Sequence, residues 1–160
     1  MSARRTLLLD TNLLVLLAVG LTDKSLVGRH KRTTEYVEED FDMLYSMIHQ
    51  FDELCTTPNI LTETSNLLAQ SGSANRQEEI LRTLAKLTEG ADEEYVPSKQ
   101  ACRRKEFLRL GLADSVSLEK APMVNCVLTA DHDLFVSVEK AGGFAVNFNH
   151  VRTVGWIWPA

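Results

Sequence analysis

Short apolar runs alternate along the chain with longer segments of mixed polarity. Four of these runs predict strands, at residues 6–9, 53–57, 124–129 and 144–148. Strands that are apolar at consecutive positions are buried on both faces, as in a parallel sheet. Residues 94–97 predict a weaker strand, and the proline at its end places it at an edge of the sheet.

The segments between the strands carry apolar residues three or four positions apart, which is the spacing of one face of a helix. Residues 21–33 are polar and predict a loop, and Gly111 predicts a helix end. Alternation of short strands with helices predicts an α/β fold with a parallel central sheet. The expected helices are, in chain order, one from Leu13, then 34–50, 59–70, 75–89 and 98–110, a short one from Ala113, and 133–141.

The length and composition are those of one globular domain covering residues 1–160. Hydrophobic residues make up 44% of the chain and charged residues 24%. The net charge of −5 argues against a surface that is basic throughout, although a local basic patch stays open. Asp10 and Asn12 interrupt the apolar N-terminal stretch, which therefore predicts neither a signal peptide nor a membrane span.

The three cysteines are scattered and odd in number, which argues against a disulfide framework. Cys55 and Cys126 fall in expected strands, and Cys102 falls in an expected helix. We therefore expect reduced thiols in a cytoplasmic protein. The spacing of the cysteines and histidines does not predict a zinc site.

Acidic residues follow the carboxyl ends of the expected strands or lie near helix starts. Asp10 follows the first strand, and Asp131 and Asp133 follow the strand at 124–129. Glu63 and Asp114 lie near the starts of two helices. In an open parallel sheet the loops after the strand ends lie along one edge, so carboxylates far apart in sequence can meet there.

Carboxylates gathered at one place repel one another unless a cation offsets their charge. Hard oxygen ligands suit Mg²⁺ or Mn²⁺ rather than zinc. Such ions orient a water molecule, lower its pKa and stabilise the charge of a phosphoryl transition state. No Ser/His/Asp or Cys/His arrangement competes clearly, because the four histidines lack the contexts of a general base: His30, His49, His132 and His150.

Four segments resemble, in order, the motifs of the PIN-domain nucleases, a family that includes the toxin subunits of VapBC-type toxin–antitoxin pairs. They are LLLDTNLLVLL, TPNILTETSNLL, LGLADSVSL and VLTADHDLF, and the resemblance extends from Leu7 to about Phe148. It implies a three-layer α/β/α sandwich whose parallel sheet has the strand order 3-2-1-4-5. That order would place Asp10 beside Asp131.

By this resemblance, Asp10, Glu63, Asp114 and Asp131 form a quartet that holds one or two Mg²⁺ or Mn²⁺ ions. Asp133 matches a fifth, less constant acidic position. The implied reaction is hydrolysis of RNA phosphodiester bonds by metal-activated water, which leaves a 5′-phosphate and a 3′-hydroxyl.

Two polar residues are expected to support this quartet. Asn12 matches the asparagine of the family's first motif and is expected to hydrogen-bond within the site and orient a carboxylate. Thr129 is expected to act in the same way. Both expectations come from the resemblance.

The resemblance to toxin subunits also implies an antitoxin partner and, together with the apolar helix expected at 34–50, a homodimer. Residues 20–50 are longer than in the compact toxins, which leaves open a PIN branch without an antitoxin. Arg103, Arg104 and Lys105 precede Asp114 and either contact the RNA backbone or form a solvated helix face.

Two further segments have the same kind of ambiguity. The basic run at 29–32 is either an RNA contact or a solvated surface. The apolar sequence WIWP at 156–159 either packs on the core or contacts a partner.

Simpler interpretations stay open for single residues and for the whole chain. Asp10 and Asp114 are also well suited to cap helices, and Glu63 is ordinary on a solvated helix. A catalytically silent PIN fold used for binding or as a scaffold is the alternative function, and the intact quartet argues against it. A phosphatase with an aspartate nucleophile usually carries a second aspartate where this chain has Asn12.

Overall fold

The computed structural model describes residues 3–70 and 72–155. Its strands form one parallel sheet in the order β3-β2-β1-β4-β5. This order and the parallel pairing confirm the predicted α/β sheet. The strands are β1 (Thr6–Leu9), β2 (Glu53–Thr56), β3 (Asp92–Glu93), β4 (Cys126–Thr129) and β5 (Ala145–Asn147).

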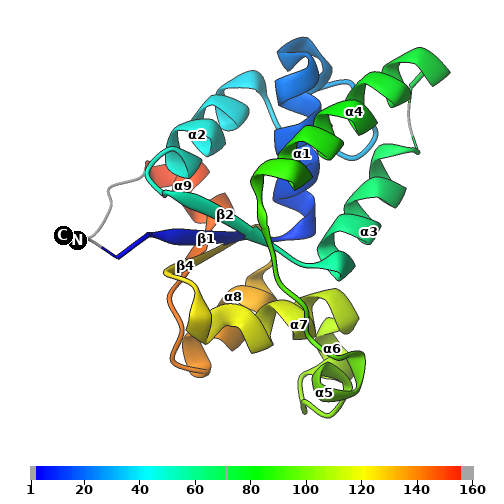
Figure 1. The fold of residues 1–160 in the computed structure, drawn as a ribbon. Helices are drawn as coiled ribbons and strands as arrows, with labels where there is room; N and C mark the ends of the chain where they lie inside the picture. The colour runs from blue at the N-terminus through cyan, green and yellow to red at the C-terminus, as the bar shows by residue number, and fades with distance from the viewer. Residues whose placement is uncertain (1–2, 71, 156–160) are drawn as a thin grey trace.

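Helices cover both faces of the sheet, which confirms the predicted three-layer sandwich. The first group lies on one side of the sheet in Figure 1: α1 (Thr11–Thr22), α2 (Glu38–Ile48), α3 (Pro58–Leu68), α4 (Ala74–Gly90) and α9 (Phe148–Val154). The second group lies on the other side: α5 (Ser98–Cys102), α6 (Phe107–Leu110), α7 (Leu112–Lys120) and α8 (His132–Lys140). Among the residues described, no helix has the length and apolar character that crossing a bilayer requires.

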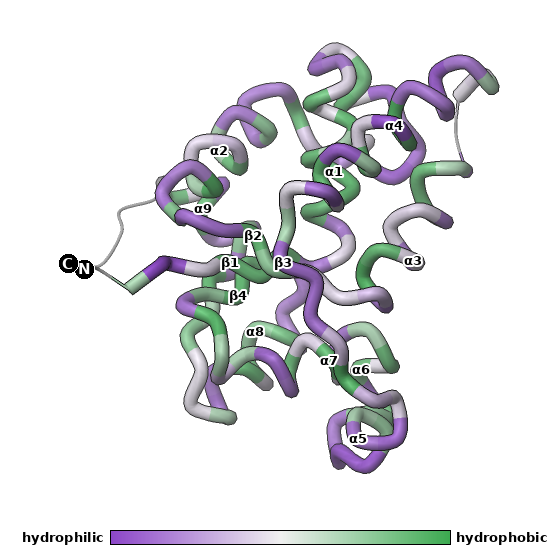
Figure 2. The backbone as a smooth tube through the Cα atoms, in the orientation of Figure 1, coloured by the Kyte–Doolittle hydropathy of each residue, from purple (hydrophilic) through white to green (hydrophobic). Residues whose placement is uncertain are grey.

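The strand β1 and the helix α1 form the centre of the hydrophobic core. The three leucines of β1 are buried, and so is every residue of α1 from Leu13 to Gly20. A helix that is apolar all round must be covered on all sides, and α2, α3 and α4 all pack on α1. Figure 2 shows hydrophobic colour in β1, β4 and α1, hydrophilic colour in β3, and mostly hydrophilic colour along α4. The apolar run that follows Asp10 therefore fixes the carboxyl end of β1 rigidly in the core.

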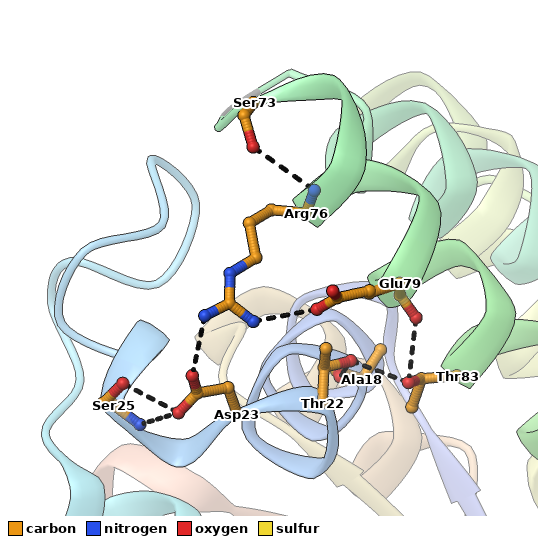
Figure 3. Close-up of polar contacts among 8 residues, drawn as sticks. All are labelled: Ala18, Thr22, Asp23, Ser25, Ser73, Arg76, Glu79 and Thr83. Carbon is orange, nitrogen blue, oxygen red and sulfur yellow. Dashed lines mark hydrogen bonds and ion pairs between the residues drawn. The ribbon is translucent and has the colours of Figure 1, made fainter.

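Polar contacts connect the start of α4 to the end of α1 (Figure 3). The Ser73 hydroxyl accepts a hydrogen bond from the backbone N–H of Arg76 at 3.3 Å and so caps α4. The Arg76 guanidinium donates to Asp23 at 3.2 Å, and the hydroxyls of Thr22 and Thr83 lie 2.7 Å apart. The Arg76–Asp23 pair is largely solvent-exposed, so it orients α4 more than it stabilises the fold.

Two predicted boundaries are corrected by the tertiary structure. The helix predicted at 34–50 begins at Glu38, because Val37 is extended and its backbone N–H donates a hydrogen bond to the Asp40 carboxylate at 2.9 Å, while Tyr36 before it is buried. The edge strand predicted at 94–97 lies at Asp92–Glu93 instead. Pairing with β2 decides its position, whereas the apolar residue of the predicted strand, Val96, packs in a small separate cluster.

Two predicted helical regions also differ. The helix predicted at 98–110 is broken into α5 and α6. Arg104 lies in the break and pairs with Glu119 of α7 at 2.6 Å, which requires the chain to turn inward there. The helix α9 was not predicted. It begins directly after β5, where the Asn147 side chain accepts a hydrogen bond from the backbone N–H of Asn149 at 3.0 Å. The predicted WIWP contact, at 156–159, lies outside the described residues.

The cysteines are free thiols. Cys55 and Cys126 are buried in β2 and β4, as predicted, and Cys102 is exposed. Burial raises the pKa of the Cys55 thiol to about 11 and that of Cys126 to about 12. The two buried thiols are therefore protonated and unreactive at neutral pH.

Candidate functional site

The site is built where β1 and β4 end side by side. Leu9, the last residue of β1, pairs with Leu128 of β4, and the backbone N–H of Asp10 donates to the Leu128 carbonyl at 3.1 Å. Asp10 and Asp131 therefore leave the sheet at the same edge. Neighbouring strands with helices on opposite faces create a crevice at this point, which is where open α/β sheets bind ligands.

The Asp10 carboxylate is the most firmly held acidic group of the site. Its side chain is buried and accepts hydrogen bonds from the backbone N–H groups of Leu13 at 3.1 Å and Ala130 at 3.0 Å, and from the Thr129 hydroxyl. Burial raises the pKa of Asp10, the three hydrogen bonds oppose that rise, and the nearby charge of Asp131 adds to it. A carboxylate has about four lone-pair positions, so about one remains for another ligand.

Thr129 hydrogen-bonds to the Asp10 carboxylate and to the backbone of Asp131. Its hydroxyl donates to Asp10 and accepts a hydrogen bond from the backbone N–H of Asp131 at 2.9 Å. One buried side chain therefore connects the two acidic loops. A hydroxyl is suited to this place because it donates and accepts at the same time.

The helix-cap interpretation is correct for Asp10 and wrong for Asp114. Asp10 caps α1, and Asp131 caps α8 by accepting from the backbone N–H of Leu134 at 3.0 Å. Asp114 is instead the third residue of α7, which follows Gly111. Gly111 has φ +80°, a conformation that glycine adopts without strain. A simple capping role therefore does not explain Asp114.

Asp114 shows that the quartet residues share one electrostatic site. The pKa of its carboxyl is raised to about 7, mainly by burial and then by the negative charges of Asp10, Asp131 and Glu63, in that order of effect. Among the described residues, its side chain has no hydrogen-bond or ion-pair partner. A carboxylate that is partly desolvated, unpaired and facing three others is unstable in its charged form unless a cation is added.

Glu63 completes the group from α3. Its exposed side chain accepts a hydrogen bond from the Thr11 hydroxyl at 3.3 Å. Thr57 caps α3 and Pro58 occupies its first position, which sets the direction of the helix. The role expected for Asn12 falls to its neighbour Thr11, because the Asn12 side chain is exposed and has no hydrogen-bond partner within residues 3–70 and 72–155.

Asp133 is in the first turn of α8 and faces a cation. The Arg109 guanidinium lies 3.5 Å from its carboxylate and donates to the Ser137 hydroxyl at 2.9 Å. Arg109 was not identified from the sequence. The sequence feature that could have identified it is its position two residues before Gly111, in the segment that leads to Asp114.

The predicted RNA-binding residues have different surroundings. Arg103 and Lys105 are exposed, whereas Arg104 pairs with Glu119 at 2.6 Å and Glu106 at 3.4 Å. Its charge is therefore largely offset within the protein. The basic run at 29–32 is in the loop before α2, where Arg32 donates to Gln70.

The donor chemistry of the site fits a hard divalent cation, since its acidic groups are all carboxylates and Asp114 lacks a compensating charge. In the parts of the chain that the structure describes, no three acidic, histidine or cysteine side chains are close enough to bind one ion together. The exposed side chains of Glu63 and Asp131 would have to turn toward Asp10 and Asp114 to do so.

Comparison with known proteins adds no family assignment. No model of a protein family matches the chain, and no curated protein matches it. The functional interpretation therefore depends on the chemistry of the site and on the resemblance of the sequence motifs.

Proposed function

We propose that this protein is a Mg²⁺- or Mn²⁺-dependent ribonuclease of the PIN type. The observation that carries the proposal is that Asp10 and Asp131 leave the sheet at the same edge and that their charges, with that of Glu63, act on the partly buried Asp114, whose pKa is raised to about 7 by burial and by these charges. The four residues would hold the cation. When bound, it would supply a more acidic water and offset the charge on the phosphoryl group.

The residues around the proposed cation have different parts in this proposal. Thr129 and the backbone N–H of Ala130 fix the Asp10 carboxylate, so it stays in place without reorganisation. Asp131 has one carboxylate oxygen bonded to its own helix and one without such a bond. Asp114 would lose its proton when the cation is present, because an added positive charge lowers its pKa.

The test is hydrolysis of single-stranded RNA with Mn²⁺, with chelator, and with a phosphomonoester as the alternative substrate. Wild type should cleave RNA only with the metal, and Asp114→Asn should lower kcat by about 10²-fold or more, the range for lost transition-state charge stabilisation. Asp42→Asn changes an exposed carboxylate on α2 and should leave activity unchanged.

End-group analysis tests the mechanism separately. Metal-activated water leaves a 5′-phosphate and a 3′-hydroxyl, so products with 2′,3′-cyclic phosphates would contradict it. Hydrolysis of the phosphomonoester alone would indicate a phosphatase. Retention of RNA without hydrolysis under any divalent cation would indicate the non-catalytic alternative.

The toxin assignment and the homodimer are also proposals. Growth arrest of a bacterial host by wild type, but not by Asp10→Ala, would support a toxin with an antitoxin partner. The apolar residues Phe41, Leu44 and Met47 of α2 pack in the protein's own core, so they do not supply a dimer surface. The homodimer therefore rests on the family resemblance, and sedimentation of a monomer at about 10⁻⁵ M, well above the Kd of a micromolar dimer, would contradict it.

A further inference from the structure

We propose that a cavity between α6 and α8 is a subsite for a backbone phosphate of single-stranded RNA, beside the carboxylates. The choice of RNA rests on the proposed function. The cavity has a volume of about 520 Å³. Four of its lining side chains are cationic and one is acidic, although the chain has a net charge of −5: Arg104, Lys105, Arg109 and Lys140, with Glu106.

The cations of this cavity differ in how far carboxylates offset their charge. Arg104 forms part of the wall and is paired with Glu119 and Glu106. Within the described parts of the chain, the ammonium groups of Lys105 and Lys140 have no ion-pair or hydrogen-bond partner. Their charge is therefore available to an anion that enters the cavity.

Arg109 connects the cavity to the acidic site. Its guanidinium donates to Ser137 at 2.9 Å and lies 3.5 Å from the Asp133 carboxylate. Asp133 follows Asp131 by two residues and lies in the first turn of α8. Arg109 is in α6, which is joined through Gly111 to α7, the helix that carries Asp114. If one phosphate of a single-stranded RNA is bound in the cavity, a neighbouring phosphodiester of the same RNA would therefore reach the carboxylates.

The chemistry of the cavity suits a phosphate of the RNA backbone. The carboxylates of the candidate site repel the phosphates of an RNA backbone, so binding needs cationic side chains close by. Lysine and arginine are the side chains that attract phosphates. The cavity between α8, β5 and α9 has mainly apolar walls, including Phe135, Phe144 and Val151, and offers a phosphate no comparable charge. The subsite is thus on the side of α8 that faces α6.

The experiment measures binding of a labelled oligouridine by fluorescence anisotropy across a salt series, in Ca²⁺, with intact RNA verified on gels. Lys105→Gln/Lys140→Gln removes the two unpaired charges. Arg82→Gln/Lys86→Gln removes the same charge from exposed positions of α4, outside the cavity. Melting curves confirm that both variants are folded. A second series replaces single linkages of the RNA by uncharged methylphosphonates.

The cavity variant should bind more weakly, and the slope of log K against log salt should become shallower by about 0.7 for each phosphate that the variant no longer neutralises. The control variant should keep the wild-type slope. One uncharged linkage should weaken binding by wild type but not by the cavity variant. The subsite would be overturned by an unchanged slope in the cavity variant or by an equal weakening in the control variant. It would also be overturned if wild type tolerated every uncharged linkage equally or did not bind RNA. Binding with the expected pattern but without hydrolysis in Mn²⁺ would contradict the proposed function and leave the subsite supported.

Discussion

Replacing Asp114 by asparagine should stabilise the metal-free protein while it removes activity. The Asp114 carboxyl is partly buried, faces Asp10, Asp131 and Glu63, and its pKa is raised from 3.8 to about 7. Asparagine keeps the shape and removes the charge. Asp114 is a more informative position than Asp10. The Asp10 carboxylate accepts three hydrogen bonds, and an asparagine there could not accept all of them, because its amide nitrogen only donates.

The sign and size of this effect follow from the two pKa values. The folded protein holds the Asp114 proton more tightly than the unfolded chain, so stability is lost as pH rises from about 4 toward 7 and is constant above that. A rise from 3.8 to about 7 corresponds to about 4 kcal/mol, at about 1.4 kcal/mol per pKa unit. Solvent reaches part of this group, so we expect about 2 kcal/mol in the free energy of unfolding.

The assay is urea unfolding in chelator from about pH 3.5 to about pH 8, which spans the unfolded pKa of 3.8 and the folded pKa of about 7. Wild type and Asp114→Asn should have similar stability at the acidic end, and the variant should be the more stable at the alkaline end. Asp42→Asn is the control, because Asp42 is exposed and pairs with Lys24 on the surface. Mn²⁺ should stabilise wild type at the alkaline end and stabilise Asp114→Asn less.

Parallel pH profiles of wild type and Asp114→Asn in chelator would refute this reasoning, because the carboxyl would then ionise normally in the folded protein. The same flattening in Asp42→Asn would show a general effect of net charge. Equal stabilisation of both proteins by Mn²⁺ would show that Asp114 takes no part in binding the metal.

Three further changes test the structure around the site. Gly20→Ala should lower the free energy of unfolding by about 1–3 kcal/mol, because the new methyl group meets the buried ring of Phe41; urea denaturation measures this. Arg152→Ala should cost about 3 kcal/mol, because it leaves the buried carboxylate of Asp40 unpaired, and Arg152→Lys should restore part of the loss. Iodoacetamide should modify Cys102 in the native protein and the other two thiols only after unfolding, as peptide mass mapping would show.

The alternation of apolar and polar segments determined the layers of the fold. Runs such as residues 6–9 are typical of strands buried on both faces, as in a parallel sheet, and the segments between them need one apolar face each. Local chemistry also fixed the caps: Asp10 and Thr57 accept hydrogen bonds from the helices that they precede. Such features depend on a few neighbouring residues, so a single sequence carries them.

Weak elements were decided by tertiary contacts. The edge strand at Asp92–Glu93 has exposed acidic side chains and no apolar pattern, and only pairing with β2 makes it a strand. Arg104 breaks the helix predicted at 98–110 because it pairs with Glu119 on α7. The two residues are adjacent only in the folded chain, so local propensity does not contain this contact.

For the candidate site, too, the sequence determined some features and tertiary contacts determined the others. Its carboxylates could be selected from the sequence, since parallel strands end at one edge of the sheet. The order 3-2-1-4-5, which places β1 beside β4, was expected only from the family resemblance and is the order in the structure. The sequence did not determine which of them would be protonated. The raised pKa of Asp114 depends on burial and on charges from three other segments, whereas Thr11 and Arg109 acquire their roles through contacts with Glu63 and Asp133. Electrostatic energies depend on distance and burial, and only the folded chain sets these quantities.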